Sequence, residues 1–245
     1  GTMANNGAVT LTPGTADQAI AAGYHNGSGK VVGDADLVAG NIASGVNLFG
    51  VVGTLTAGGG GTVAMLKTGQ TTSYGPGSDG DLQKGASRSF TDNGNGTITD
   101  NVTGLMWEKK SDDGSIHDWD NTYTWGMGTS PYTMNGTMVT TFLASLNSGG
   151  GFAGYTDWRI PNRFELETLV NLEVLSPATY TAFNNSCTAG CSVTTCSCAR
   201  SGSHWSSTTF QDGPSTAWSV SFTYGFLGNN SKTISYAVRA VRAGS

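Results

Sequence analysis

The sequence predicts an α+β fold of antiparallel strands, two short helices and long loops. Three observations lead to this class. Residues 218–223 alternate large apolar with short hydroxylated side chains, which is the pattern of a half-buried strand. Two Asn-Gly pairs at 93–96 indicate a tight β-turn. A capping-box sequence at 162–165 marks the start of a helix.

A glycine-rich stretch near residues 56–62 divides the chain into two parts. We expect a small β-rich module over 1–56, a flexible linker over 57–63 and a larger domain over 64–245. The module contains only short apolar runs between Gly-, Asn- and Asp-rich turns, without the period of a long amphipathic helix. Its one histidine, His25, is interpreted as a turn residue because no second His or Cys lies nearby.

Residues 89–100 predict a hairpin, with the apolar Phe90 before the turn and alternating residues after it. A calcium loop is the alternative, because Asp92, Asn95 and Asp100 offer oxygen ligands. The EF-hand pattern needs acceptors at alternate positions and a closing glutamate, and glycines occupy two of those positions. The turn is the favoured interpretation.

Two helices are predicted in the larger domain. The first covers about 138–147, where apolar residues recur at helical spacing before a run of glycines. The second follows Asn162 as N-cap, with Glu165 three residues later. We expect its buried face to contain Phe164, Leu166, Leu169 and Val170. Cap and surface roles explain Glu165 and Glu167 better than catalysis does.

The strand near the C-terminus is the most informative segment for function. Its apolar residues Trp218, Val220 and Phe222 predict a buried face, and Ser219, Ser221 and Thr223 predict a face that points into water. Further along, Tyr224, Phe226 and Leu227 lie on a glycine-rich turn. They are either exposed binding anchors or a cap on the core.

Four cysteines lie within twelve residues, at positions Cys187, Cys191, Cys196 and Cys198. The one-residue gap between the last two makes a four-thiolate zinc site awkward, and a bridge between those two would be strained. We therefore favour two disulfides, each joining one of the last two cysteines to one of the first two. Zinc binding and free thiols remain the alternatives.

Composition excludes several function classes. The formal net charge is -5 and no Lys/Arg cluster is present, which argues against nucleic-acid binding. No apolar run approaches the roughly 20 residues that a transmembrane helix needs, so membrane insertion is not expected. Ser206 and Ser207 lie near His204 but lack a nucleophile-elbow motif, and we expect no enzyme activity and no cofactor. The acidic stretch 112–120 could hold a structural ion.

The larger domain resembles the Lcl C-terminal family, also known as DUF1566. The matching segments include Thr-Asp-Trp-Arg-Ile-Pro-Asn-Arg at 156–163 and Gly-Leu-Met-Trp-Glu-Lys at 104–109, and they follow one another in order across 66–242. The resemblance implies a C-type-lectin-like fold, extracellular ligand binding and no known catalysis. It also places Trp107, Trp158 and Trp205 in the core with Trp218. The N-terminal module resembles a repeat of phage tail and tail-fibre proteins, which implies a spacer or attachment unit.

The same fold serves the variable proteins of diversity-generating retroelements, in which ligand-binding residues lie near the C-terminus. The resemblance therefore implies a set of variable, ligand-binding positions. All of them carry residues that adenine-directed mutation of an Asn codon can reach, although an ordinary solvated strand face is the alternative. The positions are Phe210, Ser219, Ser221, Thr223, Tyr224, Phe226, Asn229, Asn230, Ile234 and Ala237.

Together these inferences predict a ligand-binding display protein with a diversified C-terminal surface. We expect it on a virion, or outside the cell or on its surface, where it would bind a protein or glycan of a target cell. The N-terminal module could also join copies of the chain into a homo-oligomer. The alternative function is an adhesin of fixed specificity that binds glycan or glycosaminoglycan.

Overall fold

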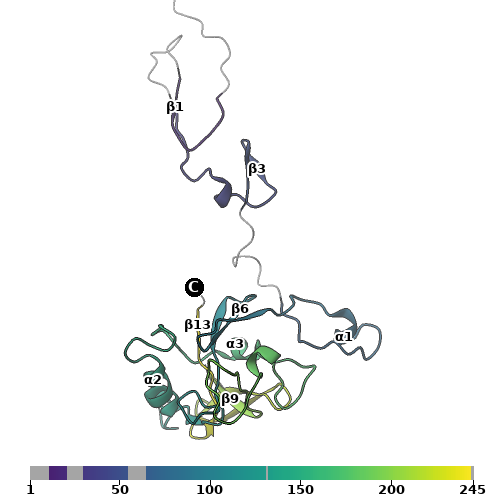
Figure 1. Ribbon diagram of the computed structural model, residues 1–245, viewed down its shortest axis with the longest axis vertical. Helices are drawn as coiled ribbons and strands as arrows, with labels where there is room; N and C mark the ends of the chain where they lie inside the picture. The colour runs from purple at the N-terminus through teal and green to yellow at the C-terminus, as the bar shows by residue number, and fades with distance from the viewer. Residues whose placement is uncertain (1–10, 21–29, 55–64, 131, 244–245) are drawn as a thin grey trace, which may run out of the picture. The chain divides into compact units, whose positions relative to one another are not determined.

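The computed structural model describes residues 11–20, 30–54, 65–130 and 132–243 (Figure 1). The chain divides into two compact units, residues 1–63 and 64–245. The expected linker at 57–63 and His25 lie outside the described residues. Among the described residues, no helix is long and apolar enough to cross a bilayer.

The smaller unit is β-rich, as predicted, and its described part consists of two short antiparallel ribbons. One ribbon pairs β1 (Gln18–Ala19) with β2 (Lys30–Val31), and the other pairs β3 (Asn47–Leu48) with β4 (Val51–Val52). A single 3-10 turn, η1 (Ala39–Asn41), lies between them in sequence. Each strand has only two residues, so most of the described part of this unit lies outside strands and helices.

A four-stranded antiparallel sheet forms one part of the larger unit. Its strands follow the order β13 (Val241–Ala243), β7 (Leu105–Glu108), β6 (Thr97–Asp100), β5 (Phe90–Asp92). The predicted hairpin is confirmed as β5 and β6, and the glycines of its turn have φ of 73° at Gly94 and 91° at Gly96. These left-handed angles explain why glycine occupies both positions. Strand β13 pairs with β7 and forms one edge of this sheet.

A second, three-stranded sheet has β10 (Thr216–Ser221) at its centre, with β9 (Ser203–Thr209) on one side and β11 (Phe226–Ser231) on the other. The short pair β8 (Tyr123–Thr124) and β12 (Ser235–Tyr236) adds a further ribbon. Among the described residues, β11 pairs only with β10, so it is the edge strand of this sheet.

The helices are short. Both predicted helices are confirmed: η2 (Met138–Leu143) is a π-helix that continues as α2 (Ala144–Leu146), and α3 (Arg163–Glu167) starts with the expected Asn162–Glu165 capping box. The remaining two are α1 (Asp79–Leu82) and η3 (Thr181–Phe183). The expected buried face of the second helix needs correction, because Phe164 is 71% exposed. The helix has only five residues, so Leu169 and Val170 lie beyond it.

The three-stranded sheet contributes to two hydrophobic clusters. Trp205 and Ala217 belong to a cluster with Phe142, Trp158 and Val238. Val220 and Phe222 belong to another with Leu166, Leu169 and Trp107. The predicted core positions of Trp107, Trp158 and Trp205 are confirmed, whereas Trp218 is half-buried.

A buried charge network ties β7 to the C-terminal segment. The Glu108 carboxylate lies 2.9 Å from the Lys110 ammonium and 2.8 Å from Nδ1 of His117, and it accepts a hydrogen bond from the backbone N–H of Ala240. Burial opposes its ionisation, but the Lys110 charge and the His117 contact hold the pKa of Glu108 below its ordinary value. Arg239 donates to the carbonyls of Glu108 and Cys198. Arg239 thus joins the C-terminal segment to β7 and to the cysteine loop.

Candidate binding surface

The structure divides the ten predicted ligand-binding positions into three classes. Four are exposed, three are half-buried and three are buried. The exposed positions are Tyr224, Phe226, Asn229 and Ile234. The half-buried ones are Phe210, Thr223 and Asn230, and the buried ones are Ser219, Ser221 and Ala237. Only the first seven can contribute directly to a binding surface.

The expectation that Ser219 and Ser221 point into water is wrong. They are 1% and 7% exposed. In the antiparallel register Ser219 lies opposite Trp205 of β9, so the two side chains share a face, and Trp205 is buried in a hydrophobic cluster. The Ser219 hydroxyl accepts a hydrogen bond from the Asn230 side chain at 3.1 Å. Ser219 and Ser221 therefore lie on a face of β10 that is covered by other residues of the unit.

Ala237 is buried for a different reason. It forms a β-bridge with His204, and its carbonyl accepts a hydrogen bond from the Trp205 N–H at 2.9 Å. Its methyl group packs inside the unit, and a larger residue there would meet the interior. Ala237 therefore does not belong to the exposed surface of this unit.

The turn between β10 and β11 carries the most exposed aromatic residues of the predicted set. Tyr224 is 60% exposed and Phe226 is 56% exposed, and their rings stack with centroids 6.2 Å apart and planes 16° apart. They do not cap the core, which was the alternative. Gly225 between them has φ of 79°, and a Cβ there would lie 2.6 Å from Val170 and 2.7 Å from Leu172. Only glycine fits this turn.

A loop that the sequence interpretation missed lies beside this turn. The Thr223 carbonyl accepts a hydrogen bond from Ser176 N–H at 3.1 Å, and the Phe222 carbonyl accepts one from Ala178 N–H. This loop exposes Leu172, Val174 and Leu175. We call the exposed apolar set of turn and loop the hairpin ridge; it consists of Leu172, Val174, Leu175, Tyr224, Phe226 and Leu227. The cluster of aliphatic residues at 172–175 was the available sequence signal, but its position depends on long-range pairing.

The face of β11 that carries Leu227 and Asn229 leads to α3. Asn229 pairs with Trp218, whose ring meets Phe210 edge-on at 5.3 Å between centroids. The guanidinium of Arg163 lies 4.8 Å from the centre of the Trp218 ring. Contacts on both sides of Trp218 explain its intermediate burial. They also bring Phe210 and Asn229 to the same side of the sheet.

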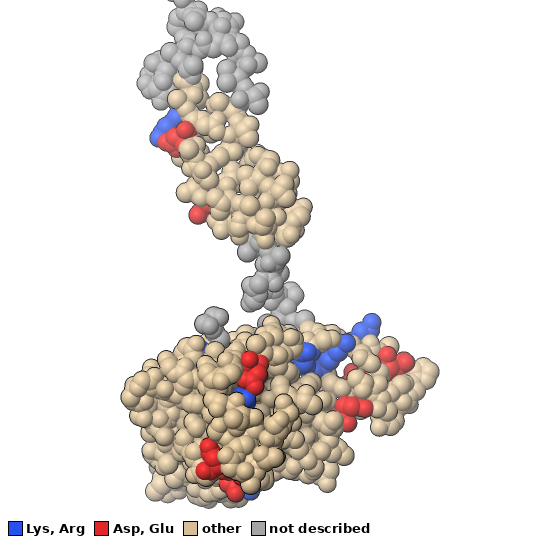
Figure 2. Space-filling model, viewed as in Figure 1, with Lys and Arg blue, Asp and Glu red and all other residues tan. Residues whose placement is uncertain are grey.

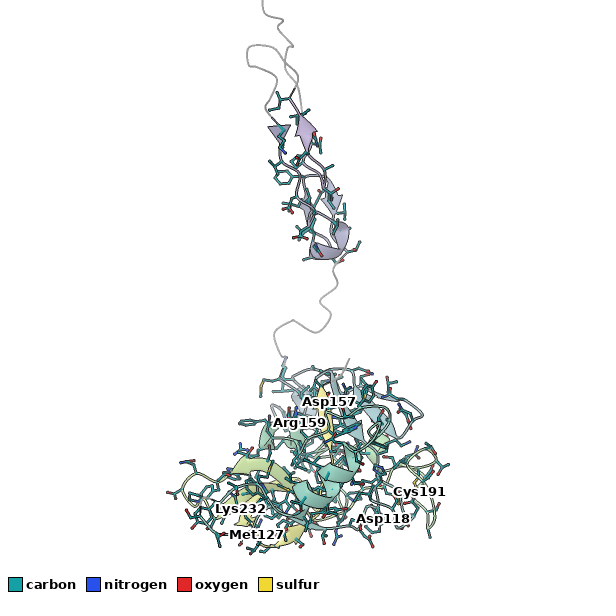
Figure 3. All side chains as sticks on the ribbon, turned by 90° about the vertical axis from the view of Figure 1, so that its left-hand side faces the viewer. Asp118, Met127, Asp157, Arg159, Cys191 and Lys232 are labelled. Atoms are coloured by element: carbon teal, nitrogen blue, oxygen red, sulfur yellow. A yellow bond between two sulfur atoms is a disulfide. The ribbon has the colours of Figure 1, made fainter. Side chains whose placement is uncertain are left out.

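All four cysteines are paired in the structure, Cys187 with Cys198 and Cys191 with Cys196. The sulfurs of Cys187, Cys191 and Cys198 lie within 4.8 Å of one another, close enough for a metal site if reduced, but in bridges they are not thiolate ligands. The loop is held by Cys198 N–H, which donates to the Lys110 carbonyl. Figure 3 shows Cys191 and Asp118 on the side of the larger unit away from Lys232 and Met127.

The titratable groups considered for catalysis do not converge. His204 is buried, and burial, helped by the charge of Arg239, lowers its pKa to about 3. The Ser206 hydroxyl donates to the Trp218 carbonyl rather than to a histidine. Glu165 and Glu167 form ion pairs with Arg159 and Arg163. The contacts of Ser206, Glu165 and Glu167 therefore fit structural roles.

The oxygen ligands considered for calcium are occupied by protein groups too. Asp92 forms an ion pair with Lys109, and Asp100 forms one with Arg88. In the acidic stretch, Asp113 accepts from Ser111 and Ser115, and Asp118 accepts from the backbone N–H of Gly114. This arrangement explains these carboxylates as turn-stabilising groups.

Most of the larger unit matches a known protein family. The model of the Lcl C-terminal domain matches residues 96–242, a range that includes all ten predicted positions, the hairpin ridge and the four cysteines. No curated protein matches the chain. Since the matched range covers more than half of the sequence, the chain belongs to the Lcl C-terminal domain family.

Proposed function

We propose that this protein recognises a partner through the hairpin ridge and performs no chemistry on it. The observation that carries the proposal is the stacked, exposed pair Tyr224 and Phe226. It extends directly from β10, a strand that is buried and hydrogen-bonded on both sides. Large aromatic side chains on a defined backbone dominate the binding energy of many interfaces, because they bury much area with few rotatable bonds.

The number of exposed apolar side chains in the turn and the adjacent loop supports the same function. The hairpin ridge gathers aromatic and aliphatic side chains from two segments that are joined by backbone hydrogen bonds. Contiguous apolar patches on a protein surface are commonly sites of interaction. The partner we propose is a protein or glycan on a target cell, met by this protein on a virion or outside its own cell.

In the form we favour, the binding surface is diversified. The larger unit would be a C-type-lectin-like variable protein of a retroelement, attached through a tail-fibre-like N-terminal module. Burial restricts useful variation to the seven exposed or half-buried positions: Phe210, Thr223, Tyr224, Phe226, Asn229, Asn230 and Ile234. The burial of Ser219, Ser221 and Ala237 favours the alternative, an adhesin of fixed specificity, because variation there would disturb the interior.

Binding can be tested by screening the protein against a glycan array and a displayed peptide library. We expect at least one ligand whose binding is lost in the double variant Tyr224→Ser/Phe226→Ser. The matched control is Tyr74→Ser/Phe164→Ser, which removes two exposed aromatic residues elsewhere on the same unit. Equal binding by both double variants would contradict the role of the hairpin ridge.

Diversification is tested separately at the level of DNA. We expect a near-copy of the region coding for residues 205–242 close to a reverse-transcriptase gene, differing only at adenines. Those differences should fall at the seven accessible positions and spare the codons of Ser219, Ser221 and Ala237. Identical C-terminal sequences in all isolates would instead establish the fixed-specificity adhesin.

A further inference from the structure

The larger unit contains an open pocket of about 430 Å³ that shares no residue with the hairpin ridge. It lies between residues 67–71, residues 83–90 and residues 180–182. Its volume falls within the range of about 300–1,000 Å³ that is usual for small-molecule sites. Eight of its eleven lining residues precede residue 96 and lie outside the range that matches the family model, whereas residues 180–182 lie within it.

The charges that line this pocket are all of one sign. Lys67 and Arg88 are its charged lining residues, and no carboxylate is among them, although the chain as a whole has a net charge of -5. The other polar groups are amides and hydroxyls, supplied by Gln70, Thr71, Gln83, Ser87, Tyr180 and Thr181. Figure 2 shows Lys and Arg side chains gathered beside the projection that carries α1. The lining therefore suits an anion with hydrogen-bonding groups.

Arg88 forms an ion pair with Asp100, and its guanidinium lies on the pocket side of that pair. Nη2 of Arg88 lies 2.8 Å from Oδ2 of Asp100, but only Arg88 lines the pocket. Asp100 is turned to its own chain neighbours, because it accepts hydrogen bonds from the Thr103 hydroxyl and from the N–H groups of Val102 and Thr103. Arg88 is thus the member of the ion pair that faces the pocket.

Arg88 also keeps hydrogen-bonding capacity that the described residues do not use. Its side chain is 4% exposed, yet Nε and Nη1 have no hydrogen-bond partner there, and neither has the buried hydroxyl of Tyr180. The guanidinium lies 5.0 Å from the centre of the Phe90 ring and 5.6 Å from that of Tyr180. Burying a charged group is unfavourable unless opposite charge lies nearby, so an anion in the pocket would stabilise the buried guanidinium.

Glu173, a carboxylate that contacts the lining residue Thr71, already has hydrogen-bond donors. Glu173 accepts hydrogen bonds from the N–H groups of Thr71 and Thr72 and from the Thr72 hydroxyl. Lys67 forms no ion pair among the described residues. The Lys67 ammonium is therefore available to a ligand at the half-buried wall of the pocket.

We propose that this pocket binds the carboxylate of a small organic ligand, with Lys67 in direct contact and Arg88 behind it. Nε and Nη1 of Arg88 are closed to solvent, so Arg88 acts on the anion through its charge. The amide and hydroxyl groups of the lining orient the rest of the ligand. A carboxylate suits two spaced cations and uncharged donors, whereas a phosphate usually meets a denser set of charges or backbone N–H groups.

The test uses acetate as probe and acetamide as its neutral analogue of equal shape. The full-length protein is followed by ¹H–¹⁵N NMR at pH 7, with acetate replacing chloride at constant ionic strength. We expect a saturable shift of the Arg88 Nε–H signal and of the backbone signals of residues 69–71 and 181–182. Acetamide should shift none of them.

Two variants assign the contact. Lys67→Gln should weaken acetate binding by at least about 5-fold, because it removes one charge-assisted contact. Lys84→Gln, which removes an exposed lysine outside the pocket lining, should leave the affinity unchanged. Shifts that do not saturate, that acetamide reproduces, or that Lys67→Gln leaves unchanged would overturn the proposal. None of these results depends on the hairpin ridge.

Discussion

Strands β10 and β11 are neighbours in one hairpin, yet their surroundings are opposite. Val220 of β10 is buried, and its partner in the register, Leu227 of β11, is exposed. The same contrast holds for Ser221 and Phe226. In this hairpin, whether a strand is central or at the edge of the sheet decides exposure more than the alternation of side chains does.

The contrast has a functional consequence. A strand covered on both faces holds the turn in place, whereas an edge strand and its turn can change side chains without disturbing the interior. Stability should therefore be sensitive to substitutions in β10 and in the groups beneath it. Binding should be sensitive to substitutions in the turn and in β11.

The largest effect on stability is expected from the charge network under the sheet. Glu108→Gln leaves the buried charges of Lys110 and Arg239 without their carboxylate. Breaking a buried pair in this way costs about 3–5 kcal/mol, and chemical denaturation should show that loss in the free energy of unfolding.

Glu173→Gln is the matched control for that experiment. It neutralises an exposed carboxylate whose pKa is lowered to about 2 by hydrogen bonds from Thr72 and from the N–H of Thr71. We expect a much smaller loss than for Glu108→Gln. Equal losses would mean that the buried network does not support the sheet.

A pair of tyrosine substitutions tests the two strands directly. Ser219→Tyr inserts a ring into a covered face and should cost about 3 kcal/mol or prevent folding, because overpacking forces neighbours to move. Asn229→Tyr adds the same ring to the exposed edge and should change the free energy of unfolding by less than about 0.5 kcal/mol. Thermal and urea unfolding of both variants provide the measurement. Equal losses of stability would mean that β10 and β11 are equally covered.

Truncation of the cross-strand partners Val220 and Leu227 measures how much each strand contributes to stability. Val220→Ala creates a cavity in the cluster with Leu166 and Leu169 and should cost about 2 kcal/mol. Leu227→Ala removes a side chain that is already exposed, so we expect well under 1 kcal/mol. A larger loss for Leu227→Ala would show that β11 is covered in solution.

The pH dependence of stability tests the burial of His204, the β9 partner of Val220. Its pKa is about 3 in the folded protein and 6.5 ordinarily, so the unfolded chain takes up a proton first as pH falls. This stabilising contribution is complete above pH 6.5 and is lost between pH 6.5 and pH 3, by up to about 1.4 kcal/mol per pH unit. His204→Gln should remove that part of the slope when unfolding is measured from pH 4 to pH 7. An unchanged slope would place His204 in contact with water.

Short sequence motifs were sufficient to predict the turns and helix ends that depend on neighbouring residues. Asn-Gly chemistry located the β5–β6 turn, and the capping box located the start of α3. The spacing of the cysteines also predicted two disulfides, each joining one of the last two cysteines to one of the first two. The structure contains such a pairing.

Properties that depend on distant partners could not be read in the same way. Alternation in β10 suggested one wet face, but Trp205 from β9 and the residues packed on it cover that face. The network of Glu108, Lys110 and Arg239 and the Lys67–Arg88 pocket join segments far apart in the chain. The network and the pocket both form only when these segments pack together, and the spacing of residues along the chain does not indicate which segments meet.

Hydroxyl-radical footprinting of single side chains tests the division between buried strand and exposed turn most directly. We expect rapid oxidation of Tyr224 and Phe226, an intermediate rate for Trp218, and strong protection of Phe222 and Trp205. Oxidation of Phe222 or Trp205 at the rate of Tyr224, or protection of Tyr224 and Phe226 in the isolated protein, would contradict it.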